Sequence, residues 1–241
     1  MKDLTTIFWK EWREILFQPG GRSKYGILLY IAIIGIFLPL NNGADWIHSS
    51  TFISYIFVFP IVVILSIVAD SFAGEKERHT LETLLASRLS DKTILFGKIG
   101  TVVSFSLCAA LLPIFLGIIV VGIKYGNTNL MPFSFGLSLI AVMLIILISL
   151  FVSSLGVLVS LWASTVKQAQ QAMSFGMMAI IGIIVFGFKS ISKEWKEVFM
   201  NLFSGDDLMY ILLKVSVSIL LLDLLLIFYT LSRFKRSRLI K

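Results

Sequence analysis

The groups best suited to chemistry gather in one polar stretch, residues 70–98, which interrupts an otherwise apolar sequence. It reads DSFAGEKERHTLETLLASRLSDKTILFGK and mixes carboxylates, guanidinium and ammonium groups with leucines. Charged groups of both signs make oriented, charge-assisted hydrogen bonds, and leucines supply packing. The stretch therefore predicts a contact with another protein.

A short amphipathic helix is expected inside this stretch. Thr80 is a good N-cap residue, and Ser90-Asp91 could cap a second helix. Four leucines follow Thr80 at helical spacing: Leu81, Leu84, Leu85 and Leu89. The pattern predicts a short helix that projects from the main body and presents one leucine stripe.

Groups for catalysis or nucleotide binding are missing from the sequence. Gly97-Lys98 is followed by Ile99-Gly100 and has no glycine five residues before Gly97, so it is not a phosphate-binding loop. The two histidines, His48 and His79, form no metal motif, and no Gly-x-Ser-x-Gly occurs. We expect no catalytic, cofactor-binding or metal site in this chain.

One further charge lies within an apolar run. Asp223 is embedded in LLLDLLLIF, where a carboxylate at mid-membrane costs roughly 2.5–3.5 kcal/mol. We expect its side chain to face protein or water, either as a polar contact with another helix or as a pathway or gating residue.

The elements that carry these groups are membrane helices. Of 241 residues, 57% are hydrophobic and 15% charged, and mean hydropathy is +0.93. Soluble domains carry about 25% charged residues. We therefore predict one all-α polytopic membrane domain over 1–241 with six transmembrane helices, whose apolar runs are 25–40, 51–69, 99–123, 135–162, 172–188 and 210–231.

The basic residues predict the orientation. Sixteen of the 21 Lys and Arg fall before residue 25, in 70–98, in 163–171 and after 231. Lys and Arg accumulate in cytoplasmic loops, so both termini and the segment 70–98 are expected in the cytoplasm. This distribution accounts for the net charge of +7 without nucleic acid as a partner.

Residues 1–20 predict an interfacial helix. Apolar side chains recur every three or four residues between Leu4 and Leu16, while Lys2, Lys10 and Arg13 lie opposite. A helix with two tryptophans and a basic face is expected to lie on the cytoplasmic membrane surface and contact lipid. Pro19-Gly20-Gly21 would then turn the chain into the first crossing.

These features together resemble the type-2 ABC transporter permeases, the membrane subunits of ATP-driven exporters. The resemblance covers the FWKEWREIL start, the six apolar runs and a Glu-x-Glu, Thr-Leu-Glu-x-Leu-Leu, Gly-Lys pattern. Its positions here are Glu75, Glu77, Thr80, Leu81, Glu82, Leu84, Leu85, Gly97 and Lys98. The chain departs from the pattern at His79, where the family usually has Gly, and around Arg88-Leu89, where it often has Pro.

The resemblance implies two functional elements. Residues 1–20 would form the elbow helix, with Phe8, Trp9, Trp12 and Arg13 at the interface. Residues 75–90 would form the coupling helix that docks on an ATPase. Its implied contact residues are Glu75, Glu77, Arg78, Thr80, Leu81, Glu82, Leu84 and Leu85, of which Glu82 is expected to matter most.

The resemblance also implies partners and a location. ATP and Mg would be held by separate ABC ATPase subunits, and a second permease, identical or homologous, would complete a path for a hydrophobic or amphipathic substrate. The location would be the plasma or inner membrane. The outer segment 189–209 is a candidate lid. Two alternatives stay open, namely an ion-gradient-driven transporter or channel and a membrane assembly factor without transport.

The topology makes a labelling prediction. In a Cys108→Ser background, a cysteine placed in 43–48 should react with a membrane-impermeant maleimide in intact cells, because this segment is expected outside. A cysteine placed in 86–92 should react only after permeabilisation. Equal labelling of both before permeabilisation would contradict the orientation.

Overall fold

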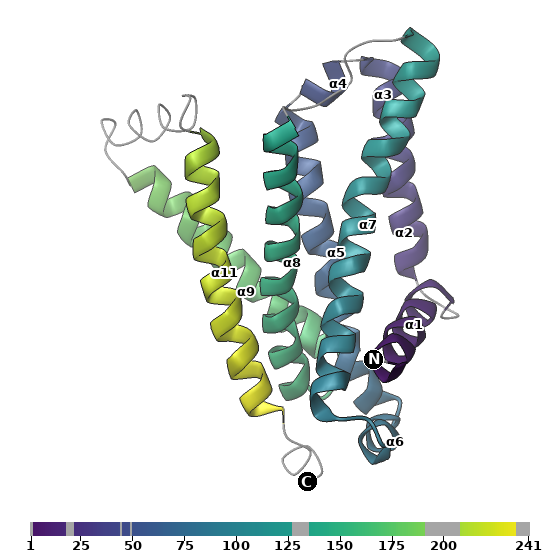
Figure 1. The fold of residues 1–241 in the computed structure, drawn as a ribbon, viewed down its shortest axis with the longest axis vertical. Coiled ribbons are helices and arrows are strands. Elements are labelled where there is room, and N and C mark those ends of the chain that lie inside the picture. Colours follow the sequence, from purple (N-terminus) through teal and green to yellow (C-terminus); the bar gives the residue numbers. More distant parts are fainter. Residues whose placement is uncertain are drawn as a thin grey trace.

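The structure is a computed structural model, and it describes residues 2–17, 22–43, 45–48, 50–126, 135–190 and 208–234. Every regular element in these ranges is helical, which confirms the all-α prediction. Most long helices run roughly along one axis, whereas α9 runs obliquely to it (Figure 1). The candidate lid falls mainly in 191–207, outside the described residues.

The N-terminal helix α1 (Lys2–Phe17) lies obliquely against the foot of the bundle (Figure 1). The next helical path consists of α2 (Arg22–Ala32), a π-helical turn η1 (Ile33–Phe37) and α3 (Leu38–Asn42). Pro39 cannot donate to the carbonyl of Gly35, and just before it Leu38 N–H bonds to Ile33 O, five residues back. The proline thus accounts for the π turn in this path.

The first helical path packs on α7 (Asp91–Tyr125) along most of its length. A Cβ on Gly35 would lie 3.1 Å from the Pro113 backbone. Farther out, the short helix α4 (Asp45–His48) buries Trp46 so closely that a Cβ on Gly117 would lie 2.2 Å from its ring. The first path and α7 therefore form one packed unit.

Helices α5 (Ser50–Glu77) and α7 extend well beyond the apolar runs expected at 51–69 and 99–123. At about 1.5 Å per residue, α7 is roughly 50 Å long, more than the bilayer core of about 30 Å. Between them lies α6 (Leu81–Ala86). The stretch 70–98 is therefore mostly the extended ends of two long helices with a one-and-a-half-turn helix between them.

The remaining helices are α8 (Phe135–Trp162), α9 (Val166–Ser190) and α11 (Leu208–Arg233). Within the described residues, α7, α8 and α11 are long and apolar enough to cross a bilayer, and 28–42 forms a shorter apolar helix. The runs expected at 51–69 and 172–188 are helical, as parts of α5 and α9.

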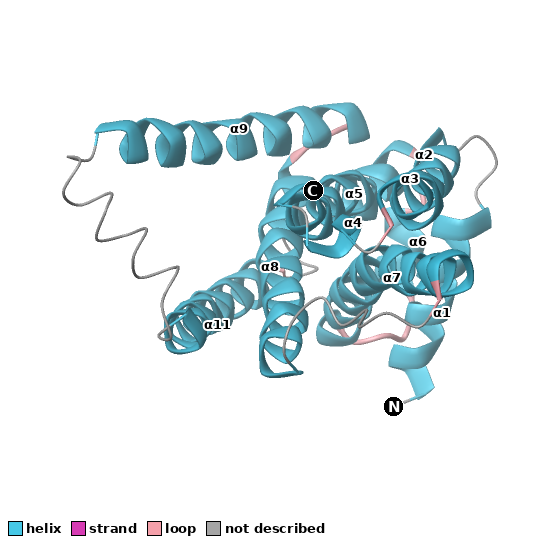
Figure 2. Ribbon diagram, turned by 90° about the horizontal axis from the view of Figure 1, so that it is seen from above, coloured by secondary structure: helices cyan, strands magenta, loops and turns pink. Residues whose placement is uncertain are grey.

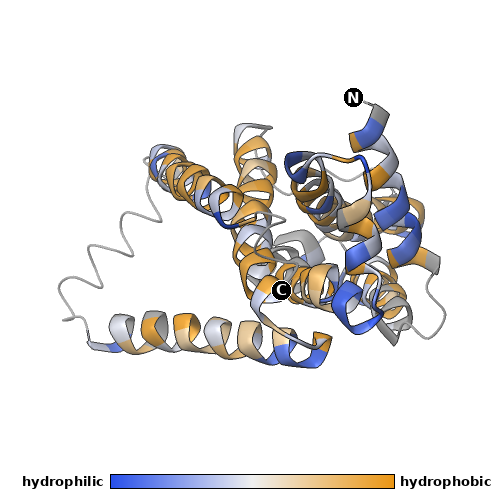
Figure 3. Cartoon of the chain, turned by 90° about the horizontal axis from the view of Figure 1, so that it is seen from below, coloured by the Kyte–Doolittle hydropathy of each residue, from blue (hydrophilic) through white to orange (hydrophobic). Residues whose placement is uncertain are grey.

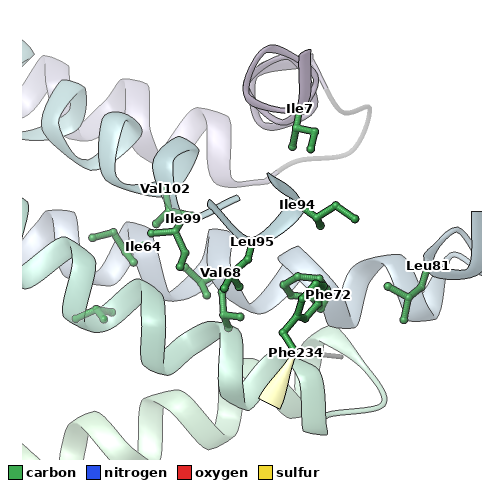
Figure 4. Close-up of a cluster of buried hydrophobic side chains, with 12 residues drawn as sticks. Ile7, Ile64, Val68, Phe72, Leu81, Ile94, Leu95, Ile99, Val102 and Phe234 are labelled. Carbon is green, nitrogen blue, oxygen red and sulfur yellow. The ribbon is translucent and has the colours of Figure 1, made fainter. Parts of the chain in front are cut away.

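The main core lies where α5, α7 and α8 meet near the foot of the bundle. It includes Ile64 and Val68 of α5, Leu95 and Ile99 of α7, and Val157 of α8 (Figure 4). The outer surfaces are apolar as well, especially on α9 and α11 (Figure 3). Buried contacts and an apolar exterior together are what a bundle in lipid requires.

Both described ends of the chain lie at the foot of the bundle. Phe234, just after α11, is buried against Phe72 of α5 with ring centroids 5.3 Å apart. Ile7 of α1 belongs to the same buried cluster. The N-terminal helix, the end of α11 and α6 therefore share one end of the molecule (Figure 1).

The turn after α5 places His79 in a left-handed backbone conformation. The Thr80 N–H bonds to Glu75 O at 2.9 Å and the His79 N–H to Lys76 O at 3.1 Å. This pair of bonds is the Schellman arrangement, whose C′ residue adopts a left-handed conformation. His79 occupies that position with φ 56°. A glycine at this position would avoid the Cβ clash that His79 accepts.

Replacing this residue should therefore stabilise the protein. We expect His79→Gly to raise the free energy of unfolding by about 0.5–1 kcal/mol, because the relief of the left-handed conformation exceeds the added freedom of the unfolded chain. The measurement is the thermal unfolding midpoint in detergent. Thr83→Gly, at an exposed position inside α6, is the control and should lower the midpoint. A lower midpoint for His79→Gly would contradict the assignment.

Candidate coupling site

The centre of the candidate site is a buried lysine that joins three helices. Lys98 of α7 is 2% exposed. Its ammonium donates to Glu11 Oε1 of α1 at 2.9 Å, to Glu75 Oε1 of α5 at 3.0 Å and to the Ser71 carbonyl of α5 at 2.9 Å. All three of its protons are used, so its position fixes α1, α5 and α7 relative to one another.

A second lysine balances this cluster. Lys10 of α1 lies 3.7 Å from Glu75 Oε1 and 3.5 Å from Glu14. Burial raises the pKa of the Glu75 carboxyl, against the opposing attraction of Lys98 and Lys10. The carboxylate therefore depends on its two lysine neighbours, and removing either one would leave buried charge uncompensated.

Close packing also holds α1 to the bundle. A Cβ on Gly97 would lie 2.6 Å from Ile7 Cγ2, so only glycine permits this approach. Trp12 Nε1 donates to Ser104 Oγ at 2.9 Å, and its ring lies 5.3 Å from that of Phe105. The face of α1 that contains Ile7 and Trp12 is thus a protein contact.

The other predicted elbow residues are divided between two environments. Phe8 is half-buried and lies 6.3 Å from Trp12, ring centroid to centroid. Trp9 is 72% exposed, and Arg13 is exposed as well. Trp9 and Arg13 are therefore the members of this set that are available to a membrane surface.

The end of α5 also holds the turn between α8 and α9. The Lys76 ammonium donates to the carbonyls of Leu161 and Ala163, at the end of α8. The Glu77 carboxylate accepts from the Val166 N–H at 3.0 Å, at the start of α9. A cation at a helix C-terminus and an anion at a helix N-terminus both interact favourably with the helix dipole, so both contacts stabilise the turn.

Helix α6 turns its leucines inward. Leu81 is 7% exposed and belongs to the main core, and Leu84 and Leu89 pack partly against that core. The side chain of Leu85 lies outside the described residues. The leucine stripe therefore fastens α6 to its own bundle, to the extent that its side chains are described.

The exposed face of this segment is polar. It contains Glu82, Thr83 and Arg88, with the small Ala86 among them. Arg78 is exposed as well and pairs with Asp70 at 3.1 Å. The predicted hydroxyl cap of Thr80 is wrong, because its side chain donates to Glu75 O at 3.4 Å instead. Ser90 does cap α7, since its hydroxyl accepts from the Thr93 N–H at 3.1 Å.

Asp223 lies away from this site, in the interface between α11 and α8. Among the described side chains of α11, those of Ser216, Asp223 and Thr230 are buried, and they are spaced seven residues apart. Neither carboxylate oxygen of Asp223 has a hydrogen-bond partner among the described residues, and the hydroxyls of Ser153 and Ser154 on α8 also lack one. Asp223 is therefore buried against protein, but the expected polar contact with another helix is not seen among the described residues.

The sequence did not reveal several residues that build the site. Glu11, Ser71 and Lys76 carry no local signal of their contacts, because their partners lie at least 27 residues away. Lys98 did carry a signal, since a lysine followed at once by a long apolar run needs an acceptor. The structure brings it to Glu75, at the other end of the recognised pattern.

Loss of the central lysine should destabilise the protein strongly. Lys98→Met keeps the side-chain length but leaves Glu11 and Glu75 without their shared cation, so we expect a loss of about 3–5 kcal/mol. The thermal midpoint and the folded yield report this loss. Exposed Lys92 of α7 gives a matched control, Lys92→Met. Adding Glu75→Gln to Lys98→Met should recover part of the stability, and equal midpoints for the two lysine variants would refute this role.

Comparison with known proteins agrees with this architecture. The ABC-2 family transporter protein profile matches residues 16–232. A curated relative, the ABC transporter permease protein NatB of Bacillus subtilis (strain 168), is 24% identical over 176 residues. That alignment spans 68% of this chain and 45% of the relative. Since the family match extends over most of the bundle, the chain belongs to the ABC-2 family of transporter proteins.

Proposed function

We propose that this chain is the membrane subunit of an ATP-driven exporter and that α6 docks on a separate ATPase subunit. The family supports a permease role, and the observation that carries the docking surface is the orientation of α6. Leu81 is held in the core and Leu84 packs against it, while Glu82, Arg88 and nearby Arg78 are exposed. A short rigid helix with an exposed charged face suits a detachable contact that must transmit force.

The residues implied by the family resemblance then have different roles. Thr80, Glu82 and Arg78 would touch the ATPase, since they are exposed. Glu75, Leu81 and Leu84 would act indirectly, by holding α6 and the end of α5 in place. Leu85 stays a proposed contact residue.

The proposed assembly has two permeases and two ATPase subunits in the plasma or inner membrane. Six crossings with both termini in the cytoplasm are supported by the shared end of the bundle at which α1, α6 and Phe234 lie. Helix α1 would be the elbow helix, with Trp9 and Arg13 against the lipid headgroups. The exposed apolar faces of α9 and α11 suit lipid, a second permease and a hydrophobic or amphipathic substrate.

Asp223 is proposed as a pathway or gating residue in this assembly. It belongs to the row of buried polar residues Ser216, Asp223 and Thr230 on an otherwise apolar helix. Charged residues are rare within membranes unless they serve function or helix contact. This row faces α8, so movement of α11 away from α8 would expose the Asp223 carboxylate to the substrate path.

The proposal predicts that a protein with Walker motifs co-purifies with the full chain under gentle extraction.

Glu82→Lys should retain insertion and folding but reduce transport-coupled ATP turnover at least tenfold, because it reverses the charge of the docking face. Asp45→Lys makes the same charge change on α4, at the opposite end, and should leave turnover unchanged. The absence of a co-purifying ATPase, or normal coupling in Glu82→Lys, would refute the docking surface.

A further inference from the structure

Helix α9 is attached to the described bundle only through its base. Ala169 and Met173 are buried, with Val166 packed beside them, against Ala69 and Ala73 of α5. Beyond Met173 no described residue of α9 is buried. Four large side chains in this part are about 70% exposed, namely Phe175, Met178, Ile183 and Phe186. Figure 2 shows α9 leaving the bundle from one end.

The base is held by the last residues of α5. Lys76 binds the terminal carbonyls of α8, and Glu77 accepts from the first N–H of α9. These two adjacent residues therefore hydrogen-bond to the backbone on both sides of the α8–α9 turn. Within the turn, Gln168 N–H donates to Thr165 Oγ1 at 3.2 Å, and Gln168 Oε1 accepts from the Ser164 N–H at 3.0 Å. The side chains of Thr165 and Gln168 thus cap the start of α9 and tie it to the turn.

A buried hydroxyl completes the connection. Ser160 of α8 accepts from the Ala73 N–H at 2.8 Å and donates to Ala69 O at 3.1 Å. Nearby, a Cβ on Gly156 would lie 2.4 Å from Val68 Cγ1 and 3.0 Å from Met173 Sδ. The end of α5, the end of α8 and the base of α9 are thus closely packed against one another.

We propose that α9 is a lever moved by the coupling segment, with Lys76 and Glu77 as the positioning residues that transmit the motion. This inference rests on the proposed ATPase docking at α6. Because α5 ends in the turn that leads to α6, a force on α6 reaches Lys76 and Glu77 directly. About 17 residues of α9 extend beyond the base, roughly 25 Å, so a tilt of about 10° would move the far end by roughly 4 Å.

The test measures the far end of α9 in the full complex with its ATPase in nanodiscs. Spin labels at Phe186→Cys and Ile123→Cys, in a Cys108→Ser background, report the distance from α9 to α7. Both parent residues are strongly exposed. A pair at Phe96 and Ile123, within α7, serves as a fixed ruler. ATP with vanadate should shift the first distance by about 3–5 Å and leave the second unchanged.

Variants identify the connection. Lys76→Met combined with Glu77→Ala should reduce the shift to under about a quarter of its value, whereas Glu77→Gln, which retains a carbonyl acceptor for Val166 N–H, should keep most of it. Lys167→Met, an exposed lysine in the first turn of α9, is the matched control and should behave like the parent. Glu77→Ala alone should lose more of the shift than Glu77→Gln alone. A merely structural role would make the shift follow the unfolding midpoint, so a loss of shift out of proportion to the change in midpoint identifies transmission.

The outcomes separate the two proposals. Failure of the ATPase to bind, or normal coupling in Glu82→Lys, would refute the docking at α6. A bound, working ATPase with no distance shift in the parent, or an undiminished shift in Lys76→Met/Glu77→Ala, would refute the lever while leaving the docking surface intact.

Discussion

The architecture at the foot of the bundle depends on the hydrogen bonds of the buried Lys98 ammonium. A desolvated charge is costly unless it is fully paired, and here two carboxylates and a carbonyl take its three protons. Because the acceptors come from α1 and α5, the penalty for separation is shared by three helices. Helix α1 therefore behaves as part of the bundle and not only as a segment lying on lipid.

Helix α5 is the structural centre because its two sides serve different neighbours. Ser71 and Glu75 face Lys98, while Ala73 and Glu77 face α8 and α9. The Glu-x-Glu spacing explains this division, since residues two apart on a helix point about 200° apart. The two carboxylates of the recognised pattern therefore join the same helix end to opposite halves of the molecule.

Helix ends are satisfied by side chains from neighbouring helices at both ends of the bundle. At the foot, Lys76 binds the last carbonyls of α8. At the opposite end of the bundle, Lys124 and Tyr125 of α7 both donate to Leu40 O, at 2.6 and 3.0 Å. Near a bilayer an unpaired carbonyl is expensive, so such caps stabilise the ends and also tie neighbouring helices together.

The sequence by itself determined the membrane environment, the helical class, the family pattern, the short helix after Thr80 and the cap at Ser90. These features depend on hydropathy, periodicity and local turn chemistry, which act over a few residues. Only the tertiary structure decided that Leu81 and Leu84 of α6 face inward, that Glu75 is buried and that Trp12 contacts Ser104. Such choices depend on partners distant in the chain, and a helical pattern marks an apolar face without saying whether lipid, another subunit or the protein's own core will cover it.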